Sequence, residues 1–126
     1  MRALNIVSTA YRATSEEQDD TVIWFVHTVR NSGAHVELML SGNSVNYAVC
    51  LQEPVPMVIG TLLQANPPRP AEDLARFIDQ GGYVYVVAED VAARGIDPST
   101  LISGVQMVSR ASLPMLFERF DRVWTW

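Results

Sequence analysis

The chain has 126 residues, of which 48% are hydrophobic and 18% are charged, a composition typical of a globular protein. This length predicts a single domain, residues 1–126, that removes roughly two-thirds of its unfolded surface from water without a disulfide or a metal. The net charge of −5 argues against a nucleic-acid partner, because contacts to phosphates require Lys and Arg. All nine basic residues are arginine, which excludes Schiff-base chemistry and Walker-type phosphate binding by lysine.

The single cysteine, Cys50, excludes an intramolecular disulfide and gives no sign of an oxidising compartment. No apolar stretch reaches the length of a transmembrane helix, and the opening residues MRALNIVST lack the pattern of a secretory signal. We therefore expect a cytoplasmic protein with no membrane partner.

The first half of the chain alternates predicted strands and helices. Residues 3–8 and 35–40 are apolar runs typical of buried strands. Between them, apolar side chains recur at positions i, i+3, i+4 and i+7 and predict a helix over residues 22–31. Capping-box spacing at Thr14–Glu17 or Ser15–Gln18 indicates how this helix begins. A second helix is predicted over residues 41–50.

Prolines separate the second half from the first. Five of them fall between Pro54 and Pro70, and they leave the structure of the apolar stretch within residues 52–69 open between helix and strand. Pro70 predicts the first turn of a helix, and Asp97 a helix N-cap. The remaining predicted elements are strands over residues 83–88, 105–109 and 122–126 and a helix carrying Leu113, Leu116, Phe117 and Phe120. This alternation predicts a five-stranded, mostly parallel sheet covered on both faces.

Two segments, RNSGAHVELMLSGNSV and GGYVYVVAEDVAARGID, carry a resemblance to a known family. The chain resembles the DsrE/DsrF-like proteins, small α/β proteins of the intracellular sulfur relay, over nearly its whole length, and ARGID is the strongest matching element. The resemblance implies an α/β, flavodoxin-like three-layer sandwich that assembles with itself as a homotrimer or homohexamer. It also implies a paralogous sulfur-relay subunit as an alternative partner, and no cofactor.

In active members of that family, a cysteine at the end of the third strand carries a persulfide. The resemblance places this cysteine at Val87 and a second one, found in some members, at Asp90. Only a thiolate accepts a sulfane sulfur, so neither residue here supports the reaction. We therefore expect a non-catalytic subunit or scaffold rather than an enzyme. The alternative is a sulfurtransferase that carries the persulfide on Cys50.

Cys50 itself has two interpretations. It is either that relocated sulfur carrier or a small hydrophobic residue packed beside Val49 and Leu51, where an apolar environment makes a thiol inert.

A third hypothesis is a small anionic ligand bound in a crevice at the carboxyl ends of the strands. The residues predicted to line this crevice follow the first and third strands: Ser8, Thr9, Val87, Ala88, Glu89, Asp90 and Arg94. Glu89 and Asp90 are either an acid/base or cation-binding pair or simply the acidic start of a short helix. Arg94 either binds the anion or forms an ion pair with one of the two carboxylates.

His27 and His35 lack further ligands at metal-binding spacing, so no metal site is predicted. Apolar side chains exceed what one small core requires, at Ile23 and Trp24, in the segment PVPMVIGTLL, and at Trp124 and Trp126. Contact between subunits is the interpretation that we favour for this excess.

Overall fold

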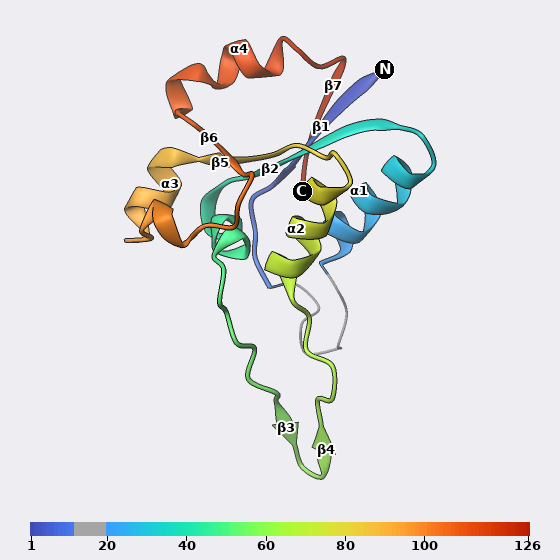
Figure 1. The fold of residues 1–126 in the computed structure, drawn as a ribbon, viewed down its shortest axis with the longest axis vertical. Coiled ribbons are helices and arrows are strands. Elements are labelled where there is room, and N and C mark those ends of the chain that lie inside the picture. Colours follow the sequence, from blue (N-terminus) through green and yellow to red (C-terminus); the bar gives the residue numbers. More distant parts are fainter. Residues whose placement is uncertain (12–19) are drawn as a thin grey trace.

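The sheet that organises the chain has five strands in the order β6-β5-β2-β1-β7 (Figure 1). The computed structural model describes residues 1–11 and 20–126. The five strands are β1 (Arg2–Val7), β2 (His35–Leu40), β5 (Val84–Val87), β6 (Gln106–Val108) and β7 (Arg122–Thr125). All four strand pairings are parallel, so the predicted parallel α/β sheet is confirmed.

Helices cover both faces of this sheet. The helical elements are α1 (Thr21–Asn31), η2 (Gly42–Ala48), α2 (Pro70–Asp79), α3 (Ala88–Ala93), η3 (Pro98–Thr100), η4 (Arg110–Ser112) and α4 (Leu113–Phe117). Side chains of α1, α2, η2 and α3 share one core cluster with the sheet, and α4 contributes to a second cluster on the opposite face. The predicted three-layer sandwich is therefore confirmed.

Alternation along the strands divides the two clusters. In β5, Val84 and Val86 belong to the cluster with α1 and α2, whereas Tyr85 and Val87 belong to the cluster with α4. Successive side chains of a strand point to opposite faces, and all four are buried because helices lie on each side.

Helix α1 begins at an aspartate that the sequence pattern did not single out. The buried Asp20 accepts hydrogen bonds from the backbone N–H groups of Val22 and Ile23 at 2.9 and 3.3 Å, which satisfies two donors at the helix start. Its second oxygen accepts the Tyr47 hydroxyl at 2.8 Å, which ties α1 to η2. The predicted capping pairs Thr14–Glu17 and Ser15–Gln18 lie outside the described residues.

Two predicted elements differ in detail. The helix expected over residues 41–50 is a 3₁₀-helix, η2. The Ser44 hydroxyl lies 2.5 Å from the carbonyl oxygen of Val7 and accepts the Ser41 N–H at 3.0 Å, so side-chain bonds replace part of the α-helical pattern. The third strand ends at Val87, and Ala88 already begins α3.

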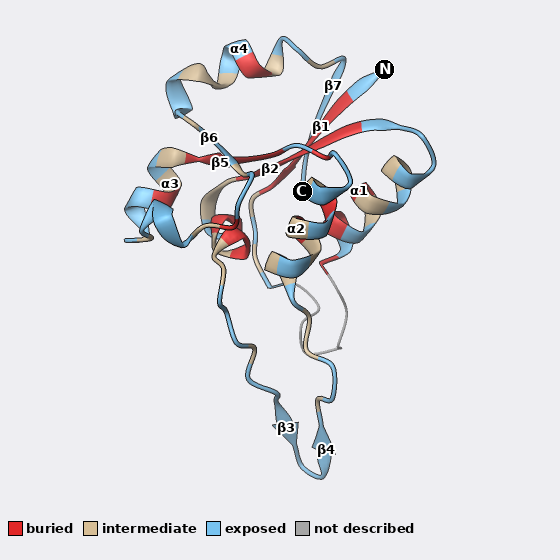
Figure 2. Cartoon of the chain, in the orientation of Figure 1, coloured by how far each residue is buried: buried red, intermediate tan, exposed pale blue. Residues whose placement is uncertain are grey.

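The segment whose structure the sequence left open forms a long projection, which we call the arm (residues 51–68). Its outer part is a two-stranded antiparallel hairpin, β3 (Val58–Ile59) and β4 (Leu62–Leu63). Figure 1 shows the hairpin far from the sheet, and Figure 2 shows it exposed. Among the helices described, none is long and apolar enough to cross a lipid bilayer.

Candidate functional site

The carboxyl ends of β2, β5 and β6 meet at Asp90, in the first turn of α3. One carboxylate oxygen of Asp90 accepts the backbone N–H of Gly42 at 2.8 Å, and the other accepts the Arg110 guanidinium at 2.7 Å. Gly42 follows β2 and Arg110 follows β6. Asp90 thus joins three segments that are remote in sequence, through charge-assisted hydrogen bonds.

Arg94 lies one helical turn after Asp90 and completes the same cluster. Its guanidinium donates to the Asn43 side-chain oxygen at 2.8 and 3.1 Å and to the Asp90 carbonyl at 3.1 Å. A guanidinium nitrogen also lies 4.0 Å from the Asp90 carboxylate. Arg94 is therefore engaged in the ion pair that the sequence offered as one of its two interpretations.

Glu89 points to a different partner from its neighbour. Its carboxylate accepts the backbone N–H of Arg110 at 2.8 Å, at the start of η4. Adjacent carboxylates with separate partners are poorly placed for shared acid/base work, because such work requires both groups to reach one reacting atom.

Gly42 explains how these segments approach each other closely. Its φ is +55°, a conformation that other residues rarely adopt. A Cβ atom at this position would lie 3.0 Å from the Ser8 carbonyl oxygen and 4.0 Å from the Arg94 guanidinium. The absent side chain lets the end of β1 and α3 pack on either side of the η2 start.

Val87 is the position where the family resemblance implies a sulfur-carrying cysteine. It is 1% exposed and lies in the α4-side cluster with Tyr85 and Leu116. Its strand partner in β6 is Val108. The position thus holds a buried isopropyl group on the face opposite the cluster that contains Val91 of α3.

Ser8 bonds to a different part of the chain from Asp90 and Arg94. The Ser8 hydroxyl donates to the backbone carbonyl of Trp126 at 2.9 Å, toward the edge strand β7. Thr9 is exposed. Among the predicted crevice residues, Glu89, Asp90 and Arg94 therefore bond at the ends of the strands, whereas Val87 is buried and Ser8 bonds to the C-terminal residue.

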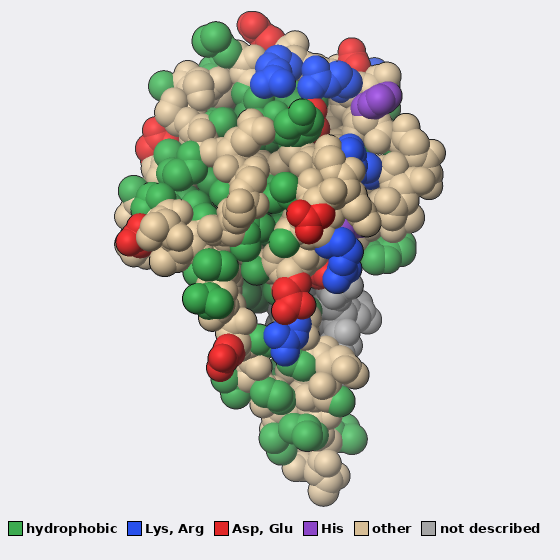
Figure 3. Space-filling model, in the orientation of Figure 1, with side chains coloured by type: hydrophobic (Ala, Val, Ile, Leu, Met, Phe, Trp, Pro, Cys, Tyr) green, Lys and Arg blue, Asp and Glu red, His purple; other side chains and the backbone are tan. Residues whose placement is uncertain are grey.

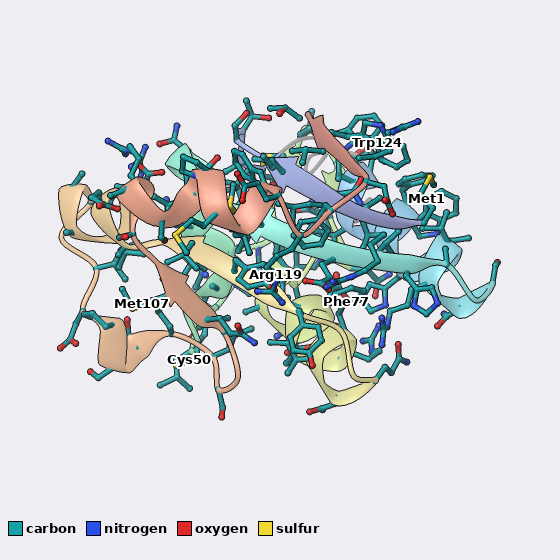
Figure 4. The ribbon with its side chains drawn as sticks, turned by 90° about the horizontal axis from the view of Figure 1, so that it is seen from above. Met1, Cys50, Phe77, Met107, Arg119 and Trp124 are labelled. Atoms are coloured by element: carbon teal, nitrogen blue, oxygen red, sulfur yellow. The ribbon has the colours of Figure 1, made fainter. Side chains whose placement is uncertain are left out.

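Cys50 lies at the base of the arm, partly exposed and packed against the α1-side core (Figure 4). Its backbone N–H donates to the Thr100 carbonyl at 2.8 Å, next to a bridge between Val49 and Leu101. Its thiol makes no hydrogen bond to any residue in the described ranges.

His27 has a packing role. An imidazole nitrogen lies 2.9 Å from the Asp73 carbonyl oxygen, and the ring meets Phe77 edge-on with centroids 5.2 Å apart. Within residues 1–11 and 20–126, no three His, Cys, Asp or Glu side chains converge as metal ligands would.

Three members of the Asp90 cluster were not predicted from the sequence: Gly42, Asn43 and Arg110. Each lies within three residues of a strand end, so the signal was present. Neighbouring parallel strands end at the same edge of a sheet, and this rule extends the search from the third strand to its two neighbours.

A hollow of about 530 Å³ opens between the arm base and the start of α2. The described residues that line it are Tyr11, Leu51, Gln52, Glu53, Pro54, Val55, Met57, Gln64, Pro67, Pro68, Arg69, Pro70, Ala71 and Glu72. The Tyr11 hydroxyl donates to the Gln52 side-chain oxygen at 3.1 Å, and burial raises the pKa of this tyrosine. At the start of α2, the Arg69 guanidinium lies 3.4 Å from the Glu72 carboxylate.

Comparisons with known proteins extend the description of the fold. No model of a known protein family matches the chain, and no curated protein sequence matches it. Among solved structures, the chain is similar to the YchN protein of E. coli, with a TM-score of 0.73 and 20% identity over 100% of both chains. It is also similar to MTH1491 of Methanobacterium thermoautotrophicum, a protein of unknown function. That match has a TM-score of 0.63 and 16% identity, over 98% of this chain and 97% of the other. At identities this low, the TM-scores show a shared fold and nothing more, and the predicted α/β sandwich is confirmed.

Proposed function

We propose that this chain is a non-catalytic subunit of an oligomer, built on a DsrE-like fold, that docks a partner instead of carrying sulfur itself. The partner is a second copy of the chain or a paralogous sulfur-relay subunit that provides the reactive cysteine. The observation that carries the proposal is Val87, a buried isopropyl group where the resemblance implies a thiol.

The arginines at the strand ends next to Val87 also support a non-catalytic role. Persulfide chemistry needs a thiolate, and a thiolate forms where nearby positive charge is available to stabilise it. The two guanidinium groups at these strand ends, Arg94 and Arg110, are already bonded to Asn43 and Asp90. The Asp90 cluster thus has a structural role, because its hydrogen bonds join the segments that follow β2, β5 and β6.

Cys50 provides the competing function, because its side chain is partly exposed. In that reaction the Cys50 thiolate attacks the terminal sulfur of a donor persulfide. A new sulfur–sulfur bond forms on Cys50, the donor's sulfur–sulfur bond breaks, and the donor leaves as a thiolate. A partly exposed thiol without a hydrogen-bond partner in the described structure has no evident activation for this step.

The experiment compares the wild-type protein with Cys50→Ser. Each is incubated with a persulfide donor and then with an acceptor thiol, and intact-mass spectrometry follows the gain and loss of one sulfur atom. We expect no difference between the two proteins in the rate at which the acceptor is charged. Faster charging by the wild-type protein would replace this proposal with the Cys50 sulfurtransferase.

The oligomeric part of the proposal has its own measurement. Light scattering after size exclusion gives the molar mass at micromolar concentration, and we expect a multiple of the 14.0 kDa chain. A monomer at every accessible concentration would contradict the oligomer of identical copies and leave only the paralogous subunit as the partner.

A further inference from the structure

The arm ends in an apolar hairpin that belongs to neither core cluster of the described residues. Val55, Val58, Ile59, Leu62 and Leu63 are each between 63% and 84% exposed. The strands β3 and β4 have two residues each and pair with one another. An isolated two-stranded hairpin of this size is marginally stable in water, so a second surface is needed to hold it.

The exposed apolar area of the arm is the size of a protein interface. Together with Leu51 and Met57, these side chains expose on the order of 900 Å², whereas each partner in a standard interface contributes roughly 800 Å². The largest apolar patch on a typical monomer is about 300–600 Å². Glu53 is the only charged residue between positions 51 and 68, so the occupant must present an uncharged surface too.

Such a surface lies on the same chain, at the edge of the sheet. A hollow of about 400 Å³, which we call the β7 hollow, is lined by Phe25, Val123, Trp124, Thr125 and Trp126. None of these side chains is charged, and both tryptophans are more than one-third exposed. β7 is an edge strand that pairs with β1, so the outer side of its backbone is available for a further strand.

The core behind the β7 hollow contains an unsatisfied polar group. Asn5 is fully buried, and its side-chain oxygen accepts the Trp126 indole N–H at 3.2 Å. Its side-chain nitrogen has no hydrogen-bond partner among the described residues. Buried donors are rarely left without an acceptor, so a hydrogen-bond acceptor is missing here among the described residues.

We propose that the arm of one copy docks in the β7 hollow of the next copy. The arm and the hollow are different surfaces, so each copy uses both, once as donor and once as acceptor. Head-to-tail contacts of this kind close into a ring or continue as a filament. Figure 1 shows the hairpin of the arm remote from the C-terminal residues of its own chain, so the arm is free to reach another copy.

This inference rests on the oligomeric part of the proposed function and names its surfaces. Two variants test it. In the arm variant, Ile59→Asp with Leu62→Asp places a charge on each residue of one cross-strand pair of the hairpin. In the hollow variant, Thr125→Arg adds charge and bulk to the β7 hollow while keeping its three aromatic side chains. Met115→Asp is the matched control, because Met115 is a 74% exposed residue of α4, outside the arm and the β7 hollow.

We expect each of the two variants to be a folded monomer by circular dichroism and light scattering, and the control to assemble like the wild type. An equal mixture of the two variants should form a dimer with one chain of each, because one intact arm then meets one intact hollow. The tryptophan fluorescence of the mixture should shift to shorter wavelength as the hollow is covered.

The outcomes separate the two proposals. A wild-type monomer contradicts the proposed oligomer and this inference together. If the wild type is an oligomer but the arm variant or the hollow variant assembles normally, the inference is wrong and the proposed function stands. A mixture that stays monomeric also overturns the inference, because arm and hollow would then not be each other's partners. A hollow variant that fails to fold is replaced by Trp124→Ser in the same mixture.

Discussion

At the scale of single residues, a chain of polar groups, buried at Tyr85 and Glu37 and exposed at Arg2, links three neighbouring strands. Tyr85 donates its hydroxyl hydrogen to one Glu37 oxygen at 2.7 Å, and the other Glu37 oxygen accepts the Arg2 guanidinium at 2.8 Å. Tyr85 is 2% exposed. Burial, and next the hydrogen bond to Glu37, raise the pKa of Tyr85 to about 12.

This raised pKa predicts a loss of stability in alkali. The free tyrosine side chain loses its proton near pH 10, so below that pH both states are protonated and the contribution is fully present. As the pH rises from about 10 toward about 12, the unfolded chain ionises first and the contribution is lost, by on the order of 2 kcal/mol. Urea unfolding across this range measures the effect, and Tyr85→Phe should flatten the decline. If the unfolding free energies of the wild type and Tyr85→Phe fell in parallel with pH, the raised pKa of Tyr85 would not be the cause of the decline.

Asp90 carries the strand-end cluster, and a second prediction concerns its removal. Asp90→Ala leaves the Gly42 N–H and the Arg110 guanidinium without their acceptor, which we expect to cost about 1–3 kcal/mol of unfolding free energy. Glu89→Ala is the matched control, because that carboxylate accepts one exposed backbone N–H and should cost less than about 1 kcal/mol. If the two variants lost the same unfolding free energy, the hydrogen bonds of Asp90 would not be what holds the strand ends together.

At the scale of elements, the sequence predicted the parts whose signals are local. Apolar periodicity identified β1, β2 and α1, and Pro70 marked the start of α2 within one residue. The hairpin of the arm has strands of two residues, too short for a period to register. The cap of α1 was missed because Ile23 lies three residues after Asp20, where the capping-box pattern requires Glu or Gln.

The candidate site was predicted only in part, for a similar reason. The Asp90–Arg94 ion pair lies within one helix, at a spacing of four residues, and the sequence shows it directly. Asn43 and Arg110 come from other strand ends, and their contacts depend on the order of strands in the sheet. That order is a property of the whole fold, which local patterns do not specify.

The connection from α2 to β5 gives the third prediction, which concerns Gly82. A Cβ atom here would lie 2.4 Å from the Phe77 ring and 2.7 Å from the Phe77 carbonyl oxygen, and the ring is 1% exposed within the core. Gly82→Ala should therefore destabilise the protein by about 1–3 kcal/mol, because the buried ring must move. Urea unfolding measures the change, with the exposed Gln80→Ala as control; an unchanged midpoint for Gly82→Ala would contradict the packing described.

At the scale of the whole molecule, the two faces of the sheet are covered unequally. α1 and α2, of 11 and 10 residues, lie on one face, whereas the five-residue α4 lies on the other. Figure 4 shows Met107 of β6 and Trp124 of β7 at opposite edges of the sheet, and both are more than one-third exposed. Apolar side chains also spread over the body and the arm in Figure 3. The excess of apolar residues noted in the sequence thus lies mainly on the surface, although Ile23 belongs to the core.

The arm provides the fourth prediction, because its outer part adds exposed apolar surface without belonging to either core cluster. Replacing residues 57–64 by two glycines removes the hairpin and the bond from the Gln64 N–H to the Met57 carbonyl, and leaves the sheet untouched. We expect the shortened chain to fold as a monomer and its unfolding free energy to change by less than about 0.5 kcal/mol. Thr125→Arg is the matched reference, because it also prevents assembly and so removes the contribution of subunit contacts from the comparison. A loss of several kcal/mol relative to that reference would mean that the hairpin packs on its own chain, and that its exposed side chains stabilise the monomer instead of joining two copies.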